Sequence, residues 1–249
     1  MRPAELVALA ALGLFALHAD AGEVRVAVAA NFTAPMKQIA AQFQADTGHT
    51  VQASYGATGK FYAQIRNGAP YDVLLAADDT TPARMASEGL AQAASRFTYA
   101  VGKLMLWSKK PGYVDGRGEV LKGSFDKLAI ANPKLAPYGV AAQETLQKLG
   151  LWSNVQSRIV MGENITQTFQ FADTGAADLA FVAMSQTVRD GKPVDGSAWP
   201  VPQALYAPIR QDAVVLAQPQ DRAAAVAFMN YLKSARAVTV IKRFGYDLP

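Results

Sequence analysis

Strand-like and helix-like segments alternate along the first part of the chain. Three apolar runs with strand character each precede a segment whose apolar residues recur at helical spacing: 24–30 before 34–48, 49–55 before 59–68, and 71–77 before 81–89. In the first of these helices Met36, Ile39 and Phe43 share one face, and Gly48 supplies a stop signal. Alternation of this kind predicts a parallel, doubly wound sheet covered by helices.

The same alternation continues less regularly beyond residue 97. The further strands are predicted at 98–108, 128–133, 157–162, 177–183 and 207–217, and the further helices at 137–150, 164–175, 220–233 and 235–245. We interpret the long strands near 99–108 and 205–216 as passages between two α/β halves. The predicted fold therefore has two lobes with a cleft between them, and ligands in such sheets bind beyond the carboxyl ends of the strands. The predicted boundaries are 22–101 plus 206–249 for lobe I and 102–205 for lobe II.

The first 21 residues have the pattern of a secretory leader. Arg2 lies near the terminus, an apolar run follows from Leu6 to Leu17, and Ala19-Asp20-Ala21 provides a small-x-small cleavage site. The apolar run is short for a bilayer-spanning helix. Residues 1–21 are thus a predicted signal peptide, and the mature protein is predicted to be periplasmic. Because the chain has no cysteine, it has no thiol for lipid attachment, and we expect a soluble protein without an anchor.

Composition excludes several classes of function. The chain has 24 Lys and Arg against 20 Asp and Glu, and the basic residues are dispersed, which argues against nucleic-acid binding. Two histidines and no cysteine exclude nearly every zinc, copper or iron site, and also histidine-based catalytic triads. We therefore expect neither a cofactor nor a bare metal cation.

Four junctions where a predicted strand meets a predicted helix carry the candidate chemistry: "AANFTAP", "SYGATGK", "NPKLAPYG" and "VMGENIT". Each places unpaired backbone N–H groups at a helix start, where the helix dipole is positive and an anion can bind. Asn31 adds a side-chain amide, Thr58 adds a hydroxyl, and Ile165 offers only its backbone N–H. Taken singly, these residues could be ordinary helix caps or turn residues. Four such junctions around one cleft favour a shared ligand.

Competing motifs are incomplete. "SYGATGKF" resembles a phosphate-binding P-loop, but Ser54 and Phe61 replace the first glycine and the final Ser or Thr. Ser124 and Lys127 match the spacing of a Ser-x-x-Lys hydrolase motif, yet the chain has no SDN or KTG partner. A secreted hydrolase using this pair is the alternative from another functional class. The pair Asp78-Asp79 is more simply read as capping the helix that follows.

The four junctions in this order, with "NGAPYDVLLAADDTTP", "SRFTYAVGKLMLWS" and the closing "IKRFGYDLP", resemble the periplasmic molybdate-binding proteins of ABC importers. The resemblance covers essentially the whole chain after the leader. It implies a two-lobed periplasmic-binding-protein fold of type II, which closes on molybdate or tungstate and delivers it, as a monomer, to an inner-membrane ABC permease. No enzymatic activity is implied.

The resemblance also implies which residues hold the oxyanion. Asn31 would supply side-chain and main-chain donors, Thr58 replaces the usual serine, and Tyr138 and Ile165 occupy the two backbone positions of the second lobe. Together these four would bind the metal as molybdate or tungstate. Two positions depart from relatives: Ala30 stands where some have a threonine, and Ala183 where others have a tyrosine. The donor count is thereby left open.

Uncharged donors suit a fully ionised tetrahedral anion. A cage of N–H and O–H groups satisfies acceptors on all four oxygens, whereas the proton of a phosphate would be buried without a partner, at roughly 1–3 kcal/mol. Sulfate is also fully ionised, so this argument does not exclude it. Sulfate, thiosulfate or another oxyanion on the same scaffold therefore remains the alternative ligand.

Overall fold

The computed structural model describes residues 21–189 and 192–249. The predicted signal peptide, 1–21, lies outside the described residues except for Ala21. Among the helices of the described ranges, none has both the length and the apolar character needed to cross a bilayer.

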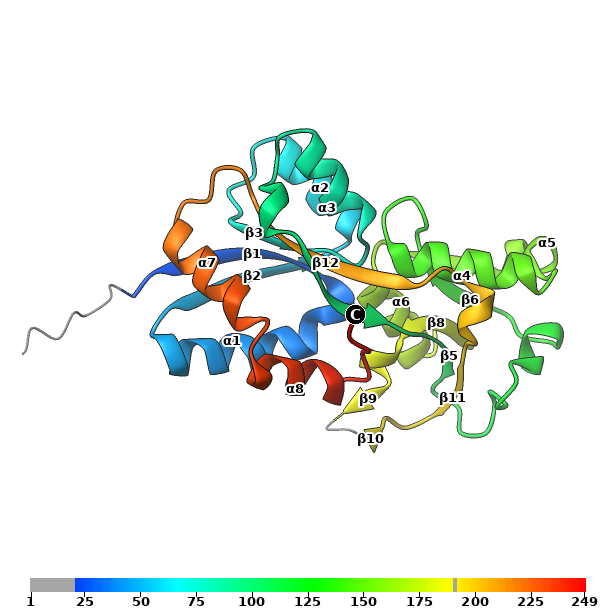
Figure 1. Ribbon diagram of the computed structural model, residues 1–249. Helices are drawn as coiled ribbons and strands as arrows, with labels where there is room; N and C mark the ends of the chain where they lie inside the picture. Colours follow the sequence, from blue (N-terminus) through cyan, green and yellow to red (C-terminus); the bar gives the residue numbers. More distant parts are fainter. Residues whose placement is uncertain (1–20, 190–191) are drawn as a thin grey trace, which may run out of the picture.

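Two five-stranded sheets organise the chain, and Figure 1 shows them side by side. The first sheet has the order β2-β1-β3-β12-β4, with β12 antiparallel to both of its neighbours. The second has the order β11-β5-β8-β6-β7, with β5 antiparallel to both of its neighbours. A short hairpin pairs β9 with β10. The strand bounds are β1 Glu23–Ala29, β2 Thr50–Gly56, β3 Val73–Leu75, β4 Phe97–Gly102, β5 Leu104–Ser108, β6 Leu128–Ala131, β7 Ile159–Gly162, β8 Leu179–Ala183, β9 Val188–Arg189, β10 Lys192–Pro193, β11 Ser197–Pro200 and β12 Ile209–Val215.

Helices cover both faces of the first sheet. In Figure 1, α1 and α8 lie below its strands, α7 runs from the level of the strands down toward α8, and α2 and α3 lie above them. Val24, Val26 and Val28 of β1 pack into the core that contains residues of α1, α7 and α8, while Ala27 packs with Phe61 of α2. A strand buried on both faces needs apolar residues on both, which explains the continuous run that predicted it. The helix bounds are α1 Thr33–Thr47, α2 Thr58–Arg66, α3 Thr80–Ser87, α4 Pro137–Lys148, α5 Trp152–Val155, α6 Ile165–Asp173, α7 Arg222–Tyr231 and α8 Ala235–Arg243.

The chain passes between the two sheets twice. The strand predicted at 98–108 is divided at Lys103 into β4 of the first sheet and β5 of the second. The return runs from β11, through 201–208, to β12. Both passages occur near the positions interpreted as crossings. The sequence did not predict β11, the β9–β10 hairpin or α5, because these short elements depend on tertiary pairing rather than on their own periodicity.

Candidate anion-binding site

A small cavity lies where the carboxyl ends of strands from both sheets meet. Its lining residues come from the four junctions and from the end of β3: Ala29, Ala30, Asn31, Gly56, Ala57, Thr58, Ala77, Ala136, Pro137, Tyr138, Asn164 and Ile165. None of these described lining residues is charged. The cavity volume is about 10 Å³, room for about one water-sized sphere. Only a compact ligand fits this arrangement, which disfavours amino acids and sugars.

Asn31 lies in the short 3₁₀ turn η1 (Ala30–Phe32) between β1 and α1 and is only 2% exposed. Its side-chain oxygen accepts no hydrogen bond from the described residues, and Ala29 and Phe32 hold the two cap positions, so the simple cap interpretation is wrong. Its Nδ2 donates to Gln211 Oε1 and to the Tyr246 hydroxyl, each at 2.9 Å. Within 21–189 and 192–249, no group donates to its Oδ1. One end of this buried amide therefore lacks a partner.

Thr58 begins α2 and is 1% exposed. Its Oγ1 accepts a hydrogen bond of 2.9 Å from the backbone N–H of Ala77. The hydroxyl does not cap its own helix, and in the described part of the chain no acceptor receives its proton. Thr58 can therefore donate that proton to an anion in the cavity.

Tyr138 and Ile165 each lie in the first turn of a helix, where N–H groups have no intrahelical partner. In α4, Pro137 has no N–H, so Tyr138 carries the first donor of that helix. In α6, the Asn164 side chain caps the N–H groups of Thr166 and Gln167, at 2.9 and 3.1 Å, and leaves that of Ile165 uncapped. Both side chains are buried. Each helix thus offers one backbone donor at the cavity.

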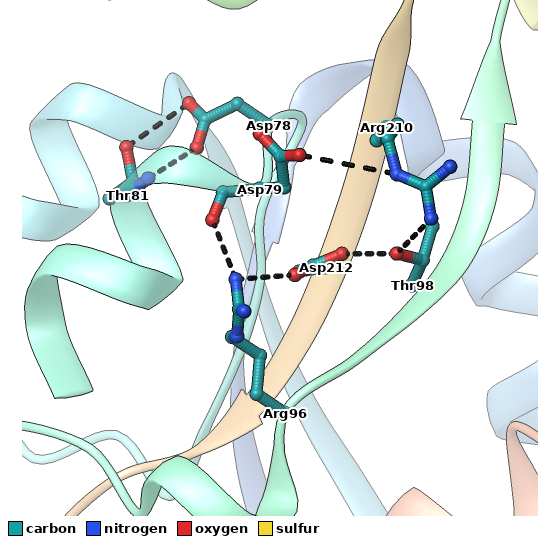
Figure 2. Close-up of polar contacts among 7 residues, drawn as sticks. All are labelled: Asp78, Asp79, Thr81, Arg96, Thr98, Arg210 and Asp212. Carbon is teal, nitrogen blue, oxygen red and sulfur yellow. Dashed lines mark hydrogen bonds and ion pairs between the residues drawn. The ribbon is translucent and has the colours of Figure 1, made fainter.

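Charged residues gather beside the cavity in a network that Figure 2 shows. Arg96 pairs with Asp212 at 3.1 Å, Thr98 donates to Asp212 at 2.6 Å, and Arg210 lies 4.0 Å from Asp79. Asp79 and Arg210 line a neighbouring cleft of about 300 Å³, which shares three lining residues with the cavity, Ala77, Ala136 and Pro137. The two arginines are therefore paired with local carboxylates, and neither lines the cavity.

The predicted capping role of Asp78-Asp79 is half correct. Asp79 is the residue before α3, but its side chain makes no capping bond. Asp78 accepts instead from the backbone N–H and the hydroxyl of Thr81, at 2.7 and 3.1 Å. Burial raises the pKa of Asp78, the Thr81 bonds lower it in part, and the nearby Asp79 and Asp212 charges add to the rise.

Replacing Asp78 by asparagine is expected to increase stability at neutral pH. The folded-state pKa of Asp78 lies above its ordinary value of 3.8. The native state thus binds the proton of the Asp78 carboxyl group more tightly than the unfolded state does. The stability that this proton provides is lost as the pH rises through the folded-state pKa. Asparagine keeps an acceptor for the Thr81 N–H without a charge. Thermal unfolding from pH 4 to 7 should therefore give Asp78→Asn a higher Tm than the parent at pH 7. A lower Tm at pH 7 would contradict this assignment.

Contacts between the unit built on the first sheet and the unit built on the second close the cavity. The backbone N–H of Gly59 donates to Leu135 O at 2.9 Å. Lys60 pairs with Glu163 at 2.6 Å, and Ser185 Oγ donates to the main-chain oxygen of Asn31 at 2.8 Å. The structure thus has the two units closed on each other at the site.

The remaining sequence candidates lie outside the cavity or contribute no donor to it. Ala30 lines the cavity without a hydroxyl, and its oxygen accepts from Thr33. Ala183 ends β8 in the apolar core and is not among the lining residues. Ser124 and Lys127 are both exposed, and no hydrogen bond joins their side chains among the residues described.

Sequence reasoning missed the residues that hold the site together. Gln211, Tyr99 and Tyr246 contact Asn31 or one another from β12, β4 and the C-terminal segment. Because these partners lie as much as 215 residues from Asn31 along the chain, no local pattern could have signalled them.

Comparison with known proteins supports the resemblance. The family of bacterial extracellular solute-binding proteins matches residues 24–247. The molybdate-binding protein ModA of Azotobacter vinelandii is 59% identical over 98% of this chain and 96% of its own length. That of Rhodobacter capsulatus is 50% identical over 96% of this chain and 94% of its own.

A solved structure agrees with these relatives. The structure of a periplasmic molybdate-binding protein from Azotobacter vinelandii superposes with a TM-score of 0.89 at 44% identity, covering 91% of this chain and 99% of that one. The expected periplasmic-binding-protein fold is thereby confirmed. The chain belongs to the bacterial extracellular solute-binding proteins and, within them, to the family of the molybdate-binding proteins.

Proposed function

We propose that this protein captures molybdate, and also tungstate, in the cavity and delivers it to an ABC permease. The observation that carries the proposal is an uncharged cavity with donors from four junctions, in a chain 59% identical to a molybdate-binding protein. The protein is a transport protein and not an enzyme. In this proposal it acts in the periplasm as a soluble monomer without a lipid anchor.

The groups proposed to bind the anion are the Asn31 amide, the Thr58 hydroxyl and the backbone N–H groups of Tyr138 and Ile165. Hydrogen bonds to a charged acceptor are stronger than those between neutral groups, and the dipoles of α2, α4 and α6 add to them. The backbone donors of Tyr138 and Ile165 are held by packed helix starts and need no rearrangement when the anion arrives. This explains how the site can hold a dianion without an arginine or lysine in its lining.

We further propose that the protein works by closure of two lobes, 22–101 with 206–249 and 102–205. Asn31 and Thr58 belong to the first and Tyr138 and Ile165 to the second, so complete coordination requires both lobes together. The cleft beside the cavity, lined in part by Asp79 and Arg210, is the proposed entrance. A permease that recognises the closed form would then accept only loaded protein.

A comparative titration tests the proposed ligand. Intrinsic tryptophan fluorescence, or calorimetry if the tryptophans do not respond, should detect molybdate and tungstate binding at the lowest concentrations. Phosphate, which retains a proton at neutral pH, should bind roughly 5- to 150-fold more weakly, because its O–H would find no acceptor in the cavity when the Asn31 amide donates to the anion. Sulfate should also bind more weakly than molybdate, through the fit of the cavity.

Sulfate provides the decisive comparison. A response to sulfate at an equal or lower concentration than molybdate would replace the proposed ligand with sulfate. Binding of none of the four anions would refute oxyanion binding altogether.

A further inference from the structure

A buried hydrogen-bond network contacts Asn31 through its side-chain nitrogen, Nδ2. Gln211 lies at its centre and is fully buried. Its Oε1 accepts from Asn31 Nδ2 at 2.9 Å and from the Tyr99 hydroxyl at 3.0 Å. Its Nε2 donates to the Tyr138 hydroxyl at 3.2 Å. Gln211 therefore links a residue of the first junction to one of the third.

The backbone is shaped to place this side chain. The register between β12 and β4 shifts at this point: Gln211 faces Ala100 but Asp212 faces Thr98, which leaves Tyr99 as an extra residue on β4. Such bulges redirect side chains beside binding sites. Gly102 provides the space, since a Cβ there would lie 2.6 Å from Gln211 Nε2 and closer still to the Tyr138 hydroxyl.

Two groups of this network are unsatisfied as they stand. Asn31 Oδ1 has no donor within the described ranges. The Tyr138 hydroxyl accepts from Gln211, and no acceptor for its own proton occurs in those ranges. Both Nδ2 protons of Asn31 are committed, to Gln211 and Tyr246. Its unpartnered oxygen is thus the polar end left for the cavity, and an oxygen there would repel an anion.

Rotating both amides by half a turn resolves these conflicts together. Gln211 Nε2 would then donate to Asn31 Oδ1, and Gln211 Oε1 would accept the Tyr138 proton. The Tyr246 hydroxyl would donate to Asn31 Oδ1, since Ser185 still serves the main-chain oxygen of Asn31. Tyr99 would keep its bond to Ala76 O at 3.0 Å. Asn31 Nδ2 would then be the end of the amide left for the cavity.

We propose that Gln211 is a positioning residue that turns together with Asn31 when an oxyanion binds, so that the Asn31 amide presents its N–H₂ to the ligand. The inference rests on the proposed function, since it concerns the same anion. Tyr138 and Ser185 come from the second unit and Gln211 and Tyr246 from the first. Closure of the units thus completes the network that favours the donor orientation.

The groups around Gln211 are suited to this role because they do not ionise near neutral pH. Burial raises the pKa of Tyr99, Tyr138 and Tyr246, so all three remain neutral hydroxyls. The nearest carboxylate along β12, Asp212, is held by Arg96 and Thr98. A pH-dependent change in a variant at position 211 can therefore be attributed to the new side chain.

The variant Gln211→Glu tests the inference. An ionised glutamate only accepts hydrogen bonds and would hold Asn31 Nδ2 away from the ligand, whereas a protonated one could donate to Asn31 Oδ1. Molybdate affinity of the variant should fall by at least about tenfold relative to the parent protein as the pH rises from 5.5 to 8. The control Gln52→Glu adds the same charge at an exposed position of β2 and should follow the parent. The proposal would be overturned if Gln211→Glu bound molybdate as tightly as the parent, or if its affinity were reduced by the same factor at every pH.

The parent protein provides a second measurement that does not depend on the folding of a variant. The side-chain amide signals of Asn31 and Gln211 in nitrogen-15 NMR spectra should both shift when molybdate is added. A shift confined to Asn31 would overturn the coupled rotation while leaving molybdate binding intact. Failure of the parent to bind molybdate would instead refute the proposed function.

Discussion

Replacing Thr58 by valine is expected to weaken molybdate binding by about 10- to 100-fold, the effect of removing one hydrogen bond to a charged group. The Thr58 hydroxyl accepts from Ala77 N–H, which orients it and leaves its proton available for the anion. Valine has nearly the same shape, so the cavity should keep its size. The variant also leaves the buried Ala77 N–H without its partner, which costs about 1–3 kcal/mol of stability. Calorimetric titration and thermal unfolding measure the two effects separately.

Thr58→Ser is the matched control, because serine keeps the hydroxyl and removes only the methyl group. It should bind molybdate nearly as well as the parent protein and should keep the bond to Ala77. Affinity unchanged in Thr58→Val, at a Tm that shows a folded protein, would remove Thr58 from the proposed ligand set. A similar loss in both variants would indicate a packing effect instead of a lost donor.

The helix starts at the site could be predicted because their signals are local. A strand-like run followed by Asn31, or by the glycines around Thr58, marks where a strand ends and a helix begins, and Pro137 fixes the first position of α4. Parallel strands bring such junctions to one edge of a sheet. The four predicted residues accordingly line one cavity.

The support behind these residues could not be predicted, because it depends on contacts distant in sequence. Gln211 is the middle of three consecutive polar residues at the start of β12, and only the register shift between β12 and β4 explains its direction. Asp78 and Asp79 are equally good caps by residue type. Their roles diverge because Thr81 lies within reach of the first, while the second faces Arg210. Tertiary geometry decides between chemically equal neighbours.

Replacing Gly139 by alanine is expected to lower stability by about 1–3 kcal/mol and to weaken molybdate binding as well. On helix propensity alone alanine would be favoured over glycine by about 1 kcal/mol. Packing opposes this preference. A Cβ at position 139 would lie 2.8 Å from the carbonyl carbon of Ala131, 2.9 Å from Pro133 N, and closer still to Ala131 O. All three are backbone atoms at the end of β6 or just after it, so the start of α4 has to move.

That movement should affect binding because Tyr138 immediately precedes Gly139 in the first turn of α4. Displacing this turn shifts the Tyr138 N–H from the cavity and pulls its hydroxyl away from Gln211. Gly116→Ala is the control, since a Cβ there meets no atom within 4 Å among the described residues, and it should match the parent in both Tm and affinity. A stable Gly139→Ala variant with parental affinity would contradict this prediction. It would show that α4 can shift without loss of binding, and that the Tyr138 N–H is not a precisely placed donor to the anion. Loss of affinity together with stability is the outcome that follows if this helix start forms one wall of the anion site.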